Sequence, residues 1–176
     1  MSDVIHLNDL DLAPVGALVG AINDDATKAA TTWKAEVHWE GGFRSSARIR
    51  EFAPLASDEP GGLGGTNQAP NPVEQVAAAL GNCLAIGYVA ALTSRAIAIE
   101  SLDITVAGEL DLRPFLGIAP GHAGFSRLDV VVAIDAAVDD VTLQAIHEQV
   151  VATSPVGNTL ASPVIVDVRL AAPTVA

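Results

Sequence analysis

The sequence contains a single cysteine, Cys83, among 176 residues. One cysteine excludes an internal disulfide, and a chain without disulfides is at home in the reducing cytoplasm. The stretch MSDVIHLNDLDLA at the amino terminus carries acidic residues where an export signal of the usual type carries basic ones. We therefore expect a cytoplasmic protein.

Basic residues are also scarce. Nine lysines and arginines stand against twenty-one acidic residues, which gives a net charge of −12. This charge repels phosphate backbones and anionic lipid, so we expect no nucleic-acid partner. The histidines are scattered without the spacing of metal ligands, and we expect neither a metal nor a cofactor. They are His6, His38, His122 and His147.

What the sequence does contain is a long apolar stretch, residues 71–92. Asn71 and Pro72 are typical of an N-cap and a first helical residue, because asparagine accepts a bond from a free N–H and proline has no N–H to satisfy. The following residues are apolar on nearly all sides, which predicts a central, buried helix. The stretch is shorter than most membrane spans and lacks a flanking basic cluster, so we expect no membrane partner.

The remaining elements follow from periodicity. Half of the residues are apolar, so the chain can form one domain with its own core. Alternation of apolar and polar residues predicts half-buried strands at 32–40, 43–52, 102–112, 127–136 and 163–170. Helical spacing predicts helices at 11–23 and 138–152. Glycine and proline predict a long surface loop at 53–70, an irregular excursion at 113–123 and a short capped turn at Ser154-Pro155.

Two motifs carry a resemblance to a known family. They are NPVEQVAAALGNC at 71–83 and SPVGNTL at 154–160. With the order of the elements around them, residues 31–171 resemble the OsmC/Ohr superfamily of osmotically inducible and organic-hydroperoxide-resistance proteins. The resemblance implies an α+β fold in which antiparallel sheets wrap around long central helices in an intertwined homodimer. Residues 1–30 would then be an N-terminal helical extension, and residues 172–176 a tail.

The resemblance also implies a set of site residues. In active members a helix cysteine attacks the peroxide, a second cysteine in a Cys-Pro turn resolves the product, and an arginine and a glutamate polarise the first thiol. Cys83 matches the helix cysteine, whereas Ser154 stands in place of the second one. Arg44 follows a Gly-Gly pair, displaced by one position from the family's arginine, and Arg48 is the alternative. We take Cys83, Arg44 and Ser154 as the candidate catalytic residues.

The family's glutamate position is Val73 in this chain, and Glu74 lies one residue later. Nine residues of helix place Glu74 and Cys83 on opposite faces and roughly 13 Å apart along the axis. Glu74 therefore cannot contact the thiol of its own helix. It is better placed to close a capping box with Asn71.

These observations leave two functional hypotheses open. The first is thiol-dependent reduction of small apolar hydroperoxides by Cys83, with rescue by an external thiol reductant because the serine cannot form a disulfide. A thiol reacts as its thiolate, and Cys83 lies too deep in its helix for the dipole to help, so a basic residue such as Arg44 must activate it. The second is a non-catalytic dimer that binds a small apolar ligand or is purely structural, with Cys83 as an inert packing residue and Ser154 as an N-cap.

Overall fold

The computed structural model describes residues 6–171, so the predicted tail lies outside the described residues. Its helices are α1 (Ala13–Asp24), α2 (Pro72–Thr93), α3 (Leu112–Phe115), α4 (Asp140–Thr153) and α5 (Pro155–Ala161), with short 3₁₀ turns η1 (Leu7–Asp9), η2 (Ala26–Ala29) and η3 (Gly61–Leu63). Its strands are β1 (Glu36–Gly41), β2 (Arg44–Arg48), β3 (Leu55–Ser57), β4 (Ile99–Leu110) and β5 (Phe125–Ala136). The chain is thus a mixture of helices and antiparallel strands, which confirms the predicted fold class.

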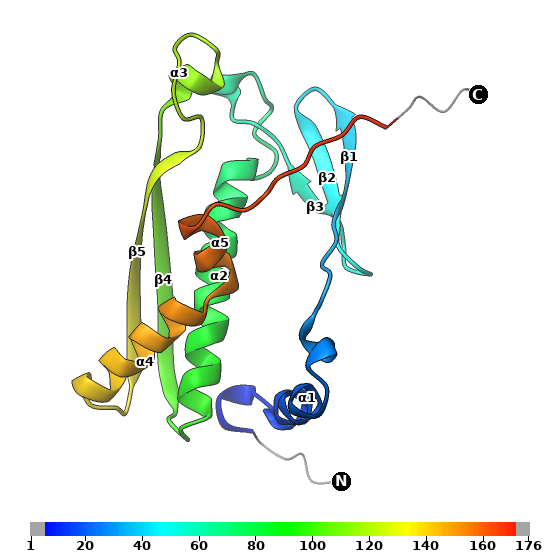
Figure 1. The fold of residues 1–176 in the computed structure, drawn as a ribbon. Coiled ribbons are helices and arrows are strands. Elements are labelled where there is room, and N and C mark those ends of the chain that lie inside the picture. Colours follow the sequence, from blue (N-terminus) through cyan, green and yellow to red (C-terminus); the bar gives the residue numbers. More distant parts are fainter. Residues whose placement is uncertain (1–5, 172–176) are drawn as a thin grey trace.

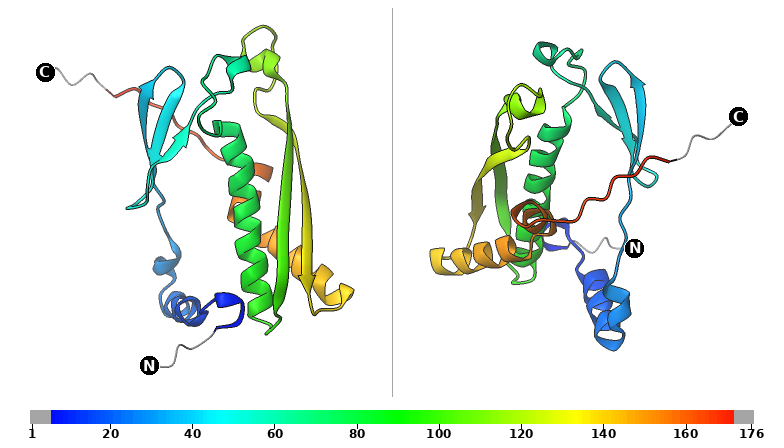
Figure 2. Two further views of the ribbon diagram at one scale, coloured as in Figure 1. Left: turned by 180° about the vertical axis from the view of Figure 1, so that it is seen from behind. Right: turned by 45° about the horizontal axis from the view of Figure 1, so that its top comes forward.

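The core forms around α2. The β4–β5 hairpin lies along one side of this helix, and α4 and α5 lie along another (Figures 1 and 2). Among the described residues the buried apolar ones come from α2 and α4: Leu80, Leu84, Tyr88, Ala91, Leu92, Ile146 and Val150. The inward residues of β4 and β5 pack against them, as the alternation at 102–112 and 127–136 predicts.

Small residues let the neighbouring elements approach α2. A Cβ atom on Gly81 would lie 3.5 Å from Val106 on β4, which is ordinary van der Waals contact. A Cβ atom on Gly87 would lie 2.8 Å from Val150 on α4, which is too close without a shift. Glycine at position 87 therefore permits the close crossing of α2 and α4.

The predicted cap of α2 is confirmed. The Glu74 N–H donates to Asn71 Oδ1 at 2.9 Å, and the Asn71 N–H donates to Glu74 Oε2 at 2.8 Å. These reciprocal bonds form a capping box and satisfy two otherwise unpaired donors. Glu74 is thereby committed to the helix terminus, as the sequence predicts.

We expect Asn71→Ala to lower the free energy of unfolding by about 1 kcal/mol, the usual cost of losing an N-cap. Glu74→Gln is the matched variant, because glutamine can still return the bond to the N-cap backbone and most of the stability is then retained. The measurement is chemical denaturation at one fixed protein concentration. Equal midpoints for Asn71→Ala and the wild type would show that the cap adds nothing.

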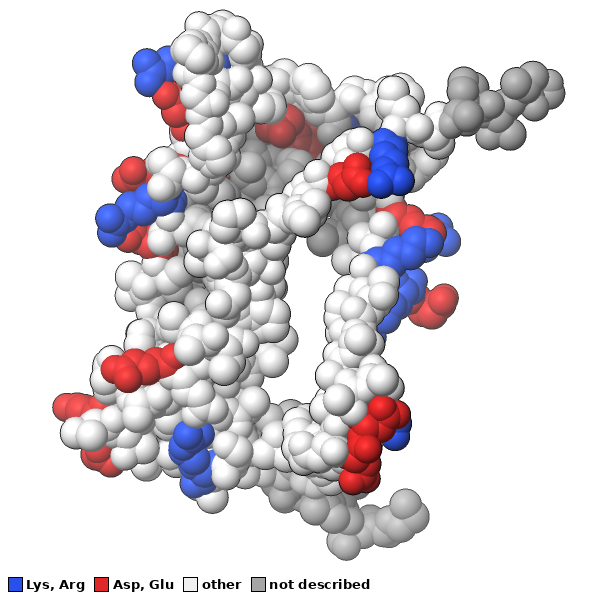
Figure 3. Space-filling view, viewed as in Figure 1, with Lys and Arg blue, Asp and Glu red and all other residues white. Residues whose placement is uncertain are grey.

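The strands β1, β2 and β3 form a second, separate antiparallel sheet. The sequence predicts half-buried strands here, but β1 is exposed on both faces, and the side chains of Val37 and Trp39 are 71% and 69% exposed. Within residues 6–171 no other layer packs on this sheet, so the prediction is wrong for the single chain. An opening passes between this sheet and the α2 layer, and Figure 3 shows charged side chains beside the sheet side of the opening but none along its α2 side.

The predicted strand at 163–170 is also absent from the described structure. These residues run on from α5 toward the β1–β3 sheet without entering a sheet, and Ile165, Val168 and Leu170 are at least 86% exposed. A strand exists only when it pairs with another, and this one has no partner in the single chain. The short turn predicted at Ser154-Pro155 is instead the start of the two-turn helix α5. The first three residues of the predicted 113–123 excursion belong to the short helix α3.

The 53–70 segment is more ordered than a surface loop. It contributes β3, and the carboxylate of Asp58 organises the residues that follow. Asp58 is 1% exposed and accepts hydrogen bonds from the backbone N–H groups of Glu59, Thr66 and Gln68 and from the Thr66 hydroxyl. The hydrogen bond from the Thr66 hydroxyl, supported by the backbone donors, lowers the pKa of Asp58 below its ordinary value. The charged carboxylate thus holds the loop that leads into α2.

Candidate functional site

The candidate site is the contact between α2 and the corner that joins α4 to α5. Cys83 Sγ lies 3.3 Å from Ser154 Oγ, and either group can be the donor. The thiol is partly exposed, whereas Ser154 is 4% exposed. The structure therefore brings together two of the three residues that the sequence predicts for the site.

The position of Ser154 is fixed by its own role in the corner. Its Oγ accepts a hydrogen bond from the Gly157 N–H at 3.1 Å, which makes it the N-cap of α5. The side chain of Asn158 donates to the carbonyls of Ser154 and Ala152 and ties the start of α5 to the end of α4. Since the oxygen already accepts from Gly157, its O–H is free to donate to the sulfur. A donor in that place stabilises a thiolate.

A cavity of about 490 Å³ adjoins this pair. Ser154 forms part of its wall, but Cys83 does not line it in the single chain. The other lining residues come from α2, β5, α4 and α5 and are mainly apolar: Leu80, Leu84, Tyr88, Leu128, Val130, Val132, His147, Val151, Ala152, Gly157, Asn158 and Ala161. Such a space suits a compact apolar molecule with one or two polar atoms.

Tyr88 and His147 are two of the polar residues that line the cavity, with Ser154 and Asn158. A hydrogen bond of 2.5 Å joins the Tyr88 hydroxyl to His147 Nδ1, and the two rings are stacked. Tyr88 is 1% exposed, and burial raises the pKa of its hydroxyl above the ordinary value of 10.0. The group therefore stays protonated at neutral pH. Sequence reasoning did not link these residues, because they lie on different helices and no motif connects them.

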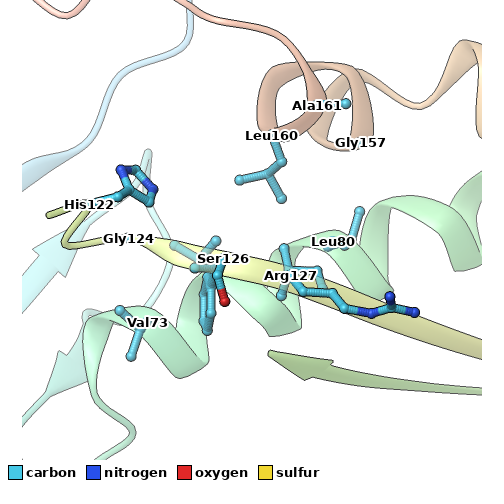
Figure 4. Close-up of a pocket in the computed structure, with 12 residues that line it drawn as sticks. Val73, Leu80, His122, Gly124, Ser126, Arg127, Gly157, Leu160 and Ala161 are labelled. Carbon is cyan, nitrogen blue, oxygen red and sulfur yellow. The ribbon is translucent and has the colours of Figure 1, made fainter. Parts of the chain in front are cut away.

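A second cavity of about 600 Å³ continues from the first along β5. The two share Leu80, Leu128, Gly157 and Ala161. Figure 4 shows Leu160 of α5 reaching toward the strand that carries Ser126 and Arg127, with His122 beyond the far end. Together the two cavities form one apolar groove between β5 and the α4–α5 corner.

The third predicted residue, Arg44, is not part of this arrangement in the single chain. It lies on β2, in the sheet that stands across the opening from α2 (Figure 1). Among the described residues no hydrogen bond or ion pair joins Arg44 or Arg48 to Cys83 or Ser154. The role of either arginine at the thiol stays a prediction.

Other kinds of site find little support in residues 6–171. No group of three or more histidine, cysteine, aspartate or glutamate side chains there is arranged to hold a metal ion. One described helix, α2, is long and apolar enough to cross a membrane by length and composition. This is weak evidence for a membrane span, because α2 packs against β4, α4 and α5 as the core helix of a domain does.

The fold and the site define an α+β protein whose long, capped core helix presents one thiol to a helix-capping hydroxyl. Comparison with known families gives the next step. The family model described as "OsmC-like protein" matches residues 65–169, and the chain belongs to this family. No sequence among the curated proteins matches it significantly.

Solved structures of similar fold include an OsmC-like protein from Mycoplasma pneumoniae. It has a TM-score of 0.64 and 17% identity over 74% of this chain and 88% of the other. An organic hydroperoxide resistance protein OsmC from Legionella pneumophila has a TM-score of 0.54 and 19% identity over 74% and 91%. One from Elizabethkingia anophelis has a TM-score of 0.53 and 19% identity over 73% and 88%. At these identities the likeness establishes the fold.

Proposed function

We propose that this protein is a cytoplasmic, thiol-dependent peroxidase that reduces organic hydroperoxides through Cys83. The observation that carries the proposal is the 3.3 Å contact between Cys83 Sγ and Ser154 Oγ beside an apolar cavity. Membership of the OsmC-like family supports it, as do structural neighbours named for organic hydroperoxide resistance. The cavity matches the apolar part of such a substrate.

The reaction we propose begins with the Cys83 thiolate. The sulfur attacks one peroxide oxygen, an S–O bond forms, and the O–O bond breaks. The other oxygen leaves as an alkoxide, takes up a proton and departs as the alcohol, while the sulfur is oxidised to a sulfenic acid. An external thiol then displaces water to form a mixed disulfide with Cys83. A second external thiol releases the Cys83 thiol and leaves as part of a disulfide.

Ser154 has a supporting part in this scheme. Its hydroxyl donates to the thiolate and cannot resolve the sulfenic acid, so turnover depends on the external thiol. The experiment is consumption of cumene hydroperoxide by the wild-type protein with added dithiothreitol, with hydrogen peroxide as the second substrate. Because the wall of the cavity is apolar, we expect the protein to turn over cumene hydroperoxide faster than hydrogen peroxide. If the protein turns over neither peroxide, the proposal is wrong.

The proposed peroxidase is a homodimer, and the exposed surface of the chain supports this. A folded monomer of 18.0 kDa exposes about 8,000 Å², whereas this chain exposes 13293 Å². The excess is about 5,000 Å², several times the roughly 800 Å² that each partner buries in a standard interface. The uncovered sheet, the unpaired 163–170 segment and the exposed side of α2 around Ile86 all contribute to it. Sedimentation velocity at micromolar concentration tests this, and a monomer overturns it.

The second candidate is a binding protein for a small apolar ligand. The cavity favours it, because Tyr88 and His147 give a mainly apolar space polar groups, and neither needs a reactive sulfur to bind a ligand. Titration with 8-anilinonaphthalene-1-sulfonate, a fluorescent apolar probe, separates the candidates. Saturable binding by both the wild type and Cys83→Ala, with no peroxide turnover by either, favours the binding protein.

A further inference from the structure

Helix α1 is an apolar helix that, within residues 6–171, is packed mainly by the short η2 turn that follows it. None of its residues is buried, and Val15, Leu18 and Val19 are each more than half exposed. The sequence carries no charged residue between Asp11 and Asp24. The helix also lies outside residues 65–169, which match the family model. Family membership therefore does not account for it.

Asn8 fixes the segment that leads into α1. Its side chain donates to Thr93 Oγ1 at 2.9 Å and to the Ile97 carbonyl at 3.0 Å, and its Oδ1 accepts from the Ile99 N–H at 2.9 Å. These three bonds attach η1 to the end of α2 and the start of β4. They hold α1 beside the carboxyl end of α2, at one border of the opening seen in Figures 1 and 3.

We infer that α1 packs against a second copy of this chain and clasps the homodimer. The inference rests on the dimer proposed above. On the face shown in Figure 3 the α2 side of the opening that α1 borders carries no charged side chains, so an apolar surface can pack there. The excess of exposed surface, about 5,000 Å², is large enough to include this helix as well as the sheet and α2. Packing of α1 against the partner removes from water an apolar surface that the chain itself does not cover.

The charged residues on either side of α1 argue against a lipid surface as the partner of this helix. Asp11 precedes the helix, Asp24 and Asp25 end it, and the first basic residue of the chain is Lys28. Helices that lie on anionic bilayers carry lysine and arginine on their polar face, and this chain has a net charge of −12. A second copy needs no such charges on α1, because the contact is apolar.

The test compares two variants of the full chain that place an aspartate on opposite faces of α1. Leu18→Asp alters the face that carries Val15 and Val19, whereas Ala17→Asp places the same charge on the opposite face. Both positions are exposed, so neither variant disturbs the core, and far-UV circular dichroism checks this. In a symmetric dimer the change occurs twice, so Leu18→Asp is expected to raise the dimer dissociation constant at least about tenfold. Ala17→Asp should stay near the wild type.

The measurement is sedimentation velocity over a dilution series. A wild-type dimer with equal dissociation constants for the two variants overturns the role of α1 and leaves the dimer intact. A wild-type monomer overturns the dimer itself, which is a different failure. The last measurement is flotation of the wild type and of Leu18→Asp with vesicles of anionic phospholipid. If the wild type binds the vesicles and Leu18→Asp does not, α1 binds a membrane and the inference is wrong.

Discussion

Cys83→Ala is expected to lower the rate of cumene hydroperoxide reduction at least about 100-fold, to the level of dithiothreitol alone. No other residue of the chain can form a sulfenic acid that a thiol reduces, because Cys83 is its only cysteine and a hydroxyl such as that of Ser154 is not oxidised by a peroxide. Binding of the substrate in the cavity persists, because Cys83 does not line it. The measurement is peroxide loss under steady-state conditions, with thermal unfolding as a check on the fold.

Ser154→Ala is the companion variant. It keeps the sulfur but removes both the donor to Cys83 and the cap of α5, so an intermediate loss of activity with some loss of stability is expected. Ser154→Thr keeps a hydroxyl that can serve both as the donor and as the cap, so it is expected to retain most of the activity and the stability that Ser154→Ala loses. If Cys83→Ala and the wild type consume the peroxide at equal rates, the peroxidase proposal is wrong and the apolar binding protein becomes the better description.

The elements that the sequence predicted well are those whose stabilising contacts are local or repetitive. Asn71, Pro72 and Glu74 signal the start of α2 because a capping box needs only neighbours along the chain. The alternation along β4 and β5 signals the hairpin because one face packs on the core over residues 99–106 and 128–134. Both predictions depend on geometry that the period of a helix or strand already contains.

The residues that sequence reasoning missed depend on contacts across the fold. Asp58 gathers donors from Thr66 and Gln68 in a segment without periodicity, so nothing in the sequence marks it as the centre of the loop. Tyr88 and His147 lie 59 positions apart on two helices whose crossing angle the sequence does not give. Such pairs become visible only when the packing of α2 against α4 is known.

A third group of predictions was wrong in the single chain for a different reason. The alternating patterns at 32–40 and 163–170 show that these segments need a neighbouring layer or strand. A pattern does not say which chain provides that neighbour. Within residues 6–171 no layer covers the first segment and no strand pairs with the second. The same uncovered sheet carries Arg44, which the resemblance assigns to the thiol. A second copy would supply both the missing layer and the missing arginine.

A dimer in which Arg44 reaches the partner's thiol would let two inactive variants complement each other. Cys83→Ala and Arg44→Ala chains, each nearly inactive alone, are expected to regain activity when they are mixed and allowed to exchange subunits. If Arg44 acts on the thiol of its partner, each mixed dimer has one site with an intact cysteine and an intact arginine, while its other site lacks both. Random exchange at equal amounts then gives about one quarter of the wild-type rate per chain, because half of the dimers are mixed and half of their sites are complete.

Mixing distinguishes an arginine that acts on the partner's thiol from one that acts on the thiol of its own chain. In the second case the two variants cannot restore each other's activity. In that case every site of a mixed dimer lacks either the cysteine or the arginine, and the rate stays at the level of the single variants. Arg48 lies on the same face of β2, so Arg48→Ala is the matched control and is expected to remain active alone. If Arg48→Ala is inactive instead and complements Cys83→Ala, the activating arginine is Arg48. In either case, recovery of activity on mixing requires that the opening beside α2 is closed by a second subunit, since the sheet that carries both arginines does not reach the thiol of its own chain.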